Sequence, residues 1–320
     1  MKQFNILLLG PYYKDNKPST HNAEVGIYDA LKQLGHNVAI YDIRNSCYLN
    51  FGGLKLTTTN TTFKIDTKDI DIVLAVGPGL SDEILQSELW NSLSNSVKIL
   101  WSSEPIRLPE YRQKMMKQVG CFDHYFTFDE SEIKEYADIG IRAKFLPQAY
   151  NPEWYEVLPI SQKQKFVDHL IFIGSIGGKW SNRPILFNYI KTLGFKLNYA
   201  SVFDAPKINK AYNMHEAVIN LGLYIPESGN VDDFKGFGLQ QRIFEAYGAG
   251  QVVITNEIPS DTNQIFENKK DILFYNKNNL KEVIEYALNR KNQKRMKEFI
   301  FNNKDEHTYK QRMCKMLNLI

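Results

Sequence analysis

The sequence has few cysteines, little net charge and no long apolar run, and each absence excludes a class of protein. Its three cysteines, Cys47, Cys121 and Cys314, are far apart and fit neither a metal-ligand spacing nor a disulfide framework. A net charge of +3 over 320 residues gives no general reason to expect nucleic-acid or membrane binding. No apolar stretch approaches the length of a membrane span, and the run that ends at Gly10 lacks a signal-peptide pattern. We therefore expect a cytoplasmic protein in a reducing compartment.

The composition is that of a globular protein, with 43% hydrophobic and 23% charged residues. A chain of 320 residues is too long for one typical core, so two domains are expected. Residues 4–10 form a continuous apolar run, 23–35 have helical periodicity, and 37–44 form a second run. This order predicts a strand, a helix and a parallel strand, which together make a βαβ unit.

The same rhythm extends to about residue 150, breaks in a proline-containing segment without a period, and then restarts. We therefore predict an N-terminal domain over 1–150, a linker over 151–168, a C-terminal domain over 169–305 and a terminal helix over 306–320. The expected strands alternate with helices, one of them over 81–93, and lie at 71–77, 97–105, 124–129, 143–149, 169–175, 196–201, 217–224, 251–255 and 272–276.

A Gly/Ser-rich turn follows the predicted strand at 169–175, in the stretch IFIGSIGGKWSNR. Small side chains let a phosphate approach the free backbone N–H groups of such a turn. Gly174 and Ser175 are the candidate backbone contacts, and Lys179 and Arg183 are the candidate cations. The spacing matches neither a P-loop nor GxGxxG. An ordinary strand-to-helix turn is an equally good interpretation.

The stretch LQQRIFEAYGAGQVVIT predicts a helix that begins close to Gly238. The helix dipole disfavours a cation such as Arg242 in the first turn unless an anion is nearby. Together with Gly238 and Gln241, Arg242 could clamp a diphosphate, and Glu245 could accept hydrogen bonds from a ribose. A surface ion pair between Arg242 and Glu245 remains the alternative.

At IFEAYGAGQVVITNEIP the chain resembles the helix-and-strand signature of GT-B glycosyltransferases, as in families 1 and 4. It is most similar to the CgeB-like branch at LLGPYY, GSIGGKWSNR, QQRIFEAYGAG and HTYKQR. The resemblance implies an α/β fold with two Rossmann-like domains, parallel sheets facing a central cleft and a C-terminal helix that packs back toward the N-terminal domain. It also implies that Glu245 binds the ribose of a sugar nucleotide.

The resemblance further implies a hexosyltransferase-type enzyme that moves a sugar from a nucleotide-diphosphate sugar, a UDP-sugar by expectation, to a hydroxyl acceptor. No cofactor and no metal are expected, because arginines and helix dipoles would handle the diphosphate charge. Asp232 and Asp233 are interpreted as a loop. Many retaining relatives have an acid eight positions before the signature glutamate, but here Phe237 occupies that position. The donor sugar and the stereochemical outcome therefore stay open.

The N-terminal half is expected to hold the acceptor, because open α/β sheets bind ligands at the carboxyl ends of their strands. Glu104, after the strand at 97–105, and His21 are the candidate catalytic residues. Pro11, Glu24 and Gly79 are candidates for the acceptor side. A solvated loop accounts for Glu104 as well, and a helix N-terminus accounts for Glu24.

Two other functions stay open: a sugar-nucleotide epimerase of the same fold, and a non-catalytic module that binds a nucleotide sugar. The acceptor could be a glycan, a protein, a small molecule or modified DNA. The basic run at 290–304 suggests an anionic acceptor or a membrane surface, but a solvated helix explains it too. The sequence does not define the oligomeric state.

Overall fold

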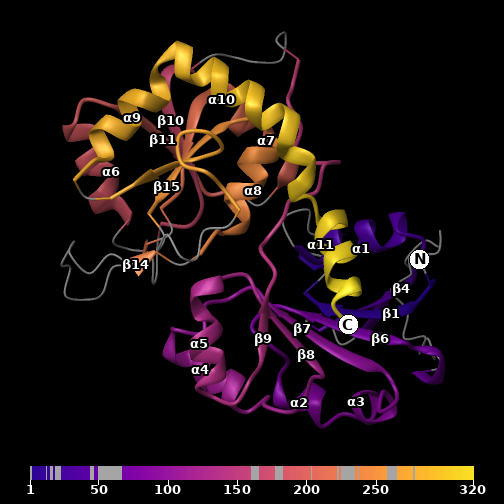
Figure 1. The fold of residues 1–320 in the computed structure, drawn as a ribbon. Coiled ribbons are helices and arrows are strands. Elements are labelled where there is room, and N and C mark those ends of the chain that lie inside the picture. The colour runs from indigo at the N-terminus through magenta and orange to yellow at the C-terminus, as the bar shows by residue number, and fades with distance from the viewer. Residues whose placement is uncertain are drawn as a thin grey trace. The chain divides into compact units, whose positions relative to one another are not determined.

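The chain forms two compact units, which we call unit 1 (Met1–Pro147 with Tyr309–Ile320) and unit 2 (Gln148–Thr308). The computed structural model describes residues 2–11, 13–14, 17–18, 23–43, 47–49, 67–159, 166–176, 183–202, 204–221, 223–224, 235–236, 238–257, 265–276 and 278–320. Each unit has a mainly parallel sheet with helices around it, so the predicted α/β class is confirmed (Figure 1).

The sheet of unit 1 contains seven described strands, and its inner strands are parallel. β1 and β6 are almost wholly apolar and buried, as expected for strands covered on both faces. Only β5 runs antiparallel, against β4. The order across the sheet is β5 (Cys47–Leu49), β4 (Asn37–Asp42), β1 (Asn5–Gly10), β6 (Ile72–Val76), β7 (Val97–Ser102), β8 (His124–Thr127) and β9 (Ala143–Phe145).

The helices of unit 1 are short, apart from α1 (Ala23–Gln33). Residues 81–93, predicted as one helix, form two, because the Ser87 hydroxyl accepts the Trp90 N–H at 3.2 Å and starts a second helix there. One helix of unit 1, which begins with a proline, was not predicted from the sequence. These elements are α2 (Asp82–Leu85), α3 (Glu88–Ser92), the unpredicted α4 (Pro109–Met116) and α5 (Ile133–Ala137).

The sheet of unit 2 contains five described strands, all parallel. Their order is β11 (Lys196–Ala200), β10 (Phe166–Ile173), β12 (His215–Ile219), β15 (Val252–Asn256) and β16 (Leu273–Tyr275). The helices are α6 (Arg183–Thr192), α7 (Ala205–Met214), α8 (Gln241–Gly248), α9 (Leu280–Leu288) and α10 (Arg290–Asn303).

Two strands of unit 2 differ from the prediction. β10 begins at Phe166, inside the segment interpreted as a linker. Residues 217–224, predicted as one strand, end their part in the large sheet at Ile219. Leu223–Tyr224 (β13) instead pairs antiparallel with Lys235–Gly236 (β14). Among the described residues, no helix is both long enough and apolar enough to cross a membrane.

The terminal helix α11 (Tyr309–Asn318) packs in unit 1 beside α1, which confirms the predicted return toward the N-terminal domain (Figure 1). A Cβ at Gly26 of α1 would lie 2.4 Å from the Tyr309 ring, so glycine is required for this contact. The Tyr309 ring also meets Trp101 edge-to-face, and Arg312 donates to the Pro147 carbonyl at 3.2 Å. The HTYKQR stretch therefore anchors the end of the chain.

The two glycines at the end of α8 and just after it also have a packing role. A Cβ at Gly248 would lie 2.4 Å from the buried ring of Tyr150, and one at Gly250 would lie 2.5 Å from Val157. Gly250 has a φ of +71°, which suits the residue after a helix C-terminus. This half of the glycosyltransferase-like signature therefore makes room for the segment that opens unit 2.

Candidate active site

Two arginines meet at the carboxyl end of the unit 2 sheet. Arg183 is the first residue of α6 and Arg242 lies in the first turn of α8. Their guanidinium carbons lie 5.1 Å and 5.6 Å from the centre of the same ring, that of Phe172 near the end of β10. Both arginines were predicted from the sequence. Phe172 was not, because in the sequence it resembles the other apolar residues of its strand.

Gly174 makes room for this pair. A Cβ there would lie 2.6 Å from Nη1 of Arg242, and its φ of +150° is one that other residues rarely adopt. The Ser175 carbonyl accepts a hydrogen bond from Nη1 of Arg183 at 2.5 Å, and the Ile173 carbonyl accepts one from Arg242 at 3.4 Å. The predicted Gly/Ser turn and the predicted helix start therefore belong to one site.

The two arginines carry charges of the same sign, which repel each other. Burial and then the charge of Arg242 lower the pKa of Arg183 from 12.5 to about 9. Burial also lowers the pKa of Arg242, against the opposing effects of Tyr212 and Glu245. The folded protein therefore holds two desolvated cations side by side at neutral pH, and an anion bound between them would relieve this cost.

Glu245 is buried, with a relative exposure of 1%. It therefore does not belong to the surface ion pair with Arg242 that was the alternative. Gln241 donates to its Oε1 at 2.9 Å, so a second candidate residue fixes this carboxylate. The helix begins at Gln241, three residues after Gly238, with Gln240 as its N-cap. Gly238 is buried in the approach to the helix. The proposed contact between Glu245 and a ribose stays a prediction.

Several candidates from the sequence lie outside the described residues. These are His21 and Lys179, the Asp232–Asp233 pair and Phe237. Among the residues that are described, no group of three or more His, Cys, Asp or Glu side chains could hold a metal ion. Metal independence stays a prediction, and so does the absence of a cofactor.

The acceptor-side candidates gather at the carboxyl end of the unit 1 sheet. Pro11, Gly79 and Glu104 follow the adjacent strands β1, β6 and β7. Glu24, in the first turn of α1, is 6% exposed, and its side chain lies against Gly10. The sheet order therefore brings four residues together that are far apart in the sequence.

Hydrogen bonds and close packing hold the loops at this end of the unit 1 sheet. The Gly79 carbonyl accepts a hydrogen bond from Nζ of Lys114 at 3.0 Å, and a Cβ at Gly79 would lie 2.5 Å from Gln118. Glu104 is half-buried, and its carbonyl accepts a hydrogen bond from the Ser102 hydroxyl at 3.1 Å. These loops are thus tied to their own unit by specific contacts.

Glu132 anchors the loop that carries Glu104, and sequence analysis missed it. Its fully buried carboxylate accepts the backbone N–H groups of Ile106 and Arg107 at 3.2 Å and 3.3 Å. Burial and the nearby charge of Asp129 raise the pKa of Glu132 to about 8. The only signal in the sequence was an acidic residue in a polar loop, which is too common to select.

The family model for glycosyl transferase-like proteins matches residues 158–318, half of the chain. The glycosyltransferase of Rickettsia africae superposes with a TM-score of 0.61 at 13% identity, covering 100% of this chain and 98% of the other. The HepE protein of Anabaena, solved with UDP and glucose, gives 0.61 at 10% identity and coverage of 99% and 100%. An alpha-glucosyltransferase solved with UDP and a DNA 13-mer containing an HMU base gives 0.61 at 10% identity and 96% coverage of both chains.

No curated protein gave a significant sequence match. The structural likeness, at these identities, concerns the fold. The family match covers all of the described arginine site in unit 2, from Phe172 to Glu245. The chain therefore belongs to the glycosyl transferase-like family, and its two α/β units have the GT-B fold.

Proposed function

We propose that this protein is a hexosyltransferase that moves a sugar from a nucleotide-diphosphate sugar to a hydroxyl acceptor. The observation that carries the proposal is the pair of guanidinium groups of Arg183 and Arg242 on the Phe172 ring. A diphosphate would bring negative charge to these two buried cations. The complexes of HepE and the alpha-glucosyltransferase with UDP support UDP as the nucleotide.

Leaving-group stabilisation is the catalytic role that we assign to the arginines. Negative charge grows on the diphosphate as its bond to the sugar breaks, and fixed cations stabilise that charge more than they stabilise the bound donor. Glu245, held by Gln241, would accept hydrogen bonds from the ribose diol. A divalent metal is not needed in this scheme, so we expect EDTA to leave the rate of UDP release unchanged.

Glu104 is our proposed base toward the acceptor hydroxyl, with Glu24, Pro11 and Gly79 on the acceptor side. Its position after β7, in a loop fixed by Glu132, supports this role. His21 stays a second candidate. The acceptor is a glycan, a protein, a small molecule or modified DNA.

The decisive experiment compares UDP binding to the unaltered protein and to Arg242→Gln by isothermal titration calorimetry. Loss of a hydrogen bond between charged groups should weaken UDP binding by roughly tenfold to a hundredfold. Arg142→Gln, which removes an exposed arginine from unit 1, is the control and should bind UDP normally. Unchanged affinity in Arg242→Gln would refute the diphosphate assignment.

Product analysis with a panel of UDP-sugars separates the alternatives. Release of free UDP, with or without an added acceptor, indicates transfer or hydrolysis. An isomerised sugar nucleotide would indicate an epimerase instead. Tight binding of UDP-sugars without any turnover would indicate a non-catalytic module.

A further inference from the structure

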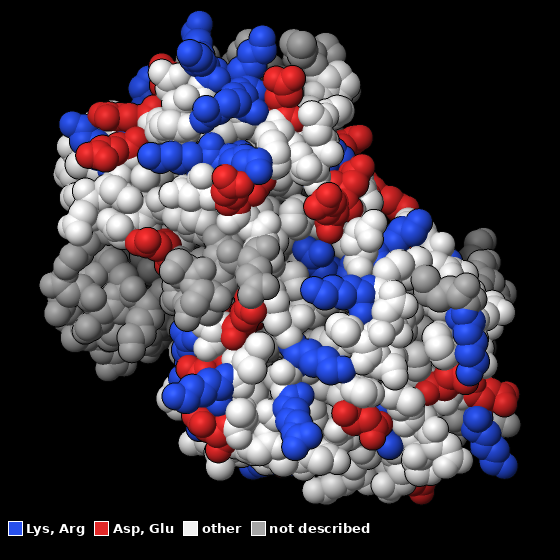
Figure 2. Space-filling view, viewed as in Figure 1, with Lys and Arg blue, Asp and Glu red and all other residues white. Residues whose placement is uncertain are grey.

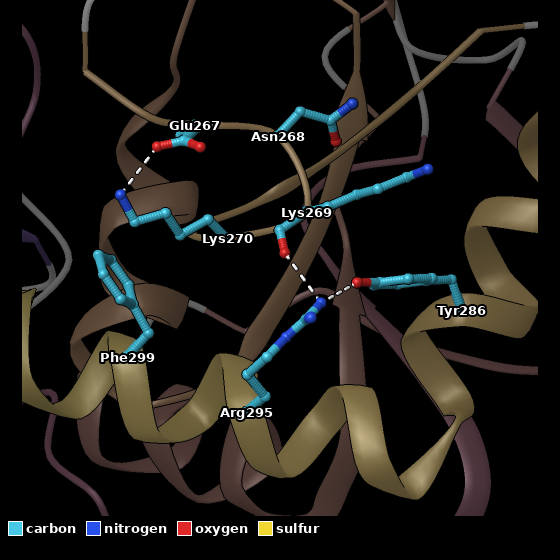
Figure 3. Close-up of a pocket in the computed structure, with 7 residues that line it drawn as sticks. All are labelled: Glu267, Asn268, Lys269, Lys270, Tyr286, Arg295 and Phe299. Atoms are coloured by element: carbon cyan, nitrogen blue, oxygen red, sulfur yellow. Dashed lines mark hydrogen bonds and ion pairs between the residues drawn. The ribbon is translucent and has the colours of Figure 1, made fainter.

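A groove of about 550 Å³ lies in unit 2 between the turn that precedes β16 and the helices α9 and α10 (Figure 3). We call it the basic groove and define it by Glu267, Lys269, Lys270, Tyr286, Arg295 and Phe299. The turn leads into the first residue of β16, so the groove lies at the amino end of the parallel sheet. The arginine site lies at the carboxyl end. The two are therefore separate sites.

Three cations, Lys269, Lys270 and Arg295, line the basic groove. Figure 3 shows the side chains of Lys269 and Lys270 pointing in opposite directions, and the guanidinium of Arg295 close to the Lys269 carbonyl. Arg295 donates to the Tyr286 hydroxyl and to the Lys269 carbonyl, the latter at 3.5 Å. Because the two lysines diverge, the positive charge is spread over the groove, which suits an extended ligand with several negative groups.

The aromatic rings of the groove hold these cations. Nζ of Lys269 lies 5.7 Å from the centre of the Tyr286 ring, and Nζ of Lys270 lies 5.0 Å from that of Phe299. Lys270 also pairs with Glu267 at 2.8 Å, whereas among the described residues neither Lys269 nor Arg295 forms an ion pair with a carboxylate. With three cations and one carboxylate, the groove has a surplus of two positive charges.

Lys269 has an unusual backbone. Its φ is +63°, a left-handed conformation that glycine adopts freely and a lysine adopts at a cost. The side chain is exposed, and its contact with the Tyr286 ring is worth only about 0.5–1 kcal/mol at such a site. A ligand that needs this ammonium group would be a further reason for lysine at this position.

The charge continues beyond the groove along α10. Arg290, Lys291 and Lys294 on this helix are exposed. Figure 2 shows lysine and arginine side chains over α9 and α10 in unit 2, with acidic side chains among them. A ligand longer than the groove would therefore meet further positive charge.

We propose that the basic groove binds a segment of an acidic polysaccharide, whose successive carboxylates pair with Lys270, Arg295 and Lys269. The Tyr286 hydroxyl and the exposed Asn268 amide suit sugar hydroxyls. A single-stranded nucleic acid fits less well, because bases stack on open ring faces and lysines lie over both rings. A membrane fits less well because both rings are only partly exposed and have lysines over them. This proposal does not depend on sugar transfer.

The test measures binding of a fluorescent oligogalacturonate by anisotropy at low and at physiological salt. We expect binding that weakens as salt rises, because the contacts are exposed ion pairs. The double variant Lys269→Gly with Arg295→Gln should bind roughly fivefold more weakly or worse. Lys191→Gln, which removes an exposed lysine from α6 in the same unit, is the matched control and should bind normally.

The single variant Lys269→Gly distinguishes a loss of ligand binding from a loss of folding. Glycine relieves the backbone strain at this position, so thermal stability should be equal or higher while oligogalacturonate binding falls. Arg242→Gln, in the arginine site, should leave oligogalacturonate binding unchanged. Absence of binding, or equal binding by the double variant, would overturn the proposal. So would a preference of the groove for a single-stranded oligonucleotide or for phosphatidylglycerol vesicles that the same variants abolish.

Discussion

The carboxyl ends of the two sheets bury different kinds of ionisable group. In unit 2 this end holds the arginine pair on Phe172. In unit 1 the corresponding end holds buried carboxylates, namely Glu24, Asp42, Asp129 and Glu132, and the half-buried Glu104. The same layered architecture therefore serves two chemistries. One end is suited to hold an anion, and the other is suited to accept or hold protons.

Burial acts on both ends in the same physical sense, because it disfavours the charged form. It raises the pKa of Glu132 to about 8 and lowers that of Arg183 to about 9. In unit 2 the diphosphate that we propose would offset this cost, and in unit 1 backbone N–H groups contact the Glu132 carboxyl group. The difference indicates that changes in unit 2 should affect donor binding, whereas changes in unit 1 should affect turnover.

The largest effect is expected at Glu104. If it is the base, Glu104→Gln should lower the rate of UDP release from a UDP-sugar by roughly 10²–10⁴-fold and leave UDP affinity unchanged. The measurement is a UDP-release assay beside a calorimetric titration with UDP. Glu110→Gln, at an exposed position of α4 in the same unit, is the control. Full turnover by the Glu104→Gln variant would show that Glu104 is not the catalytic base.

A smaller effect is expected at Gly174. An added methyl would lie 2.6 Å from Nη1 of Arg242, so Gly174→Ala should displace the guanidinium and weaken UDP binding by roughly tenfold. Gly194→Ala is the matched control, because Gly194 also has a positive φ, of +89°, but a Cβ there meets nothing within 4 Å. Both variants should lose about 1 kcal/mol of stability through strain. Equal UDP affinity in the two would show that Arg242 does not bind the nucleotide.

The last prediction concerns the pH dependence of stability and tests the unit 1 side. The folded-state pKa of Glu132, about 8, lies above its ordinary value of 4.5. The folded protein thus holds a proton that the unfolded chain releases, and stability should fall between these two values as pH rises. This slope is up to about 1.4 kcal/mol per pH unit.

Glu132→Gln should flatten that slope, because its amide does not titrate. The protein should also be less stable at every pH, because the one amide oxygen can replace only one of the two carboxylate oxygens that accept the N–H groups of Ile106 and Arg107. Thermal unfolding at pH 5.5 and pH 8 of both proteins would measure the change. Glu135→Gln alters a neighbouring, partly exposed carboxylate and should keep the slope of the unaltered protein. Parallel pH curves for Glu132→Gln and the unaltered protein would show that Glu132 is not the titrating group.

Much of the fold was predictable because its strongest signals are local. The runs NILLLG and IVLAV are apolar without alternation, and such runs are stable as strands only when both faces are covered. Helix α7 was missed although Asp204 caps it and Pro206 stands in its first turn, which are both readable start signals. Helix α4 was harder to predict, because its apolar residues do not form a regular stripe along the helix.

The candidate site was predictable in part. Gly174, Arg183 and Arg242 were found because a glycine turn and a cation in a first helical turn are unusual in a local window. Phe172 and Glu132 could not be found, because each resembles many other residues of its kind. The contacts of Gly248 with Tyr150 and of Gly250 with Val157 also join segments that are remote in the sequence, so no local pattern indicates them.

The sequence by itself determined the order of strands and helices and the loops at the strand ends, because burial of apolar faces fixes these locally. It also carried the signature that relates this chain to glycosyltransferases. Only the tertiary structure decided that Arg183 and Arg242 share one aromatic ring, that Glu245 is buried, and that carboxylates gather at the other carboxyl end. The reason is that a parallel sheet brings together the ends of strands that are remote in sequence, and pairing across that distance leaves no periodic trace in the chain.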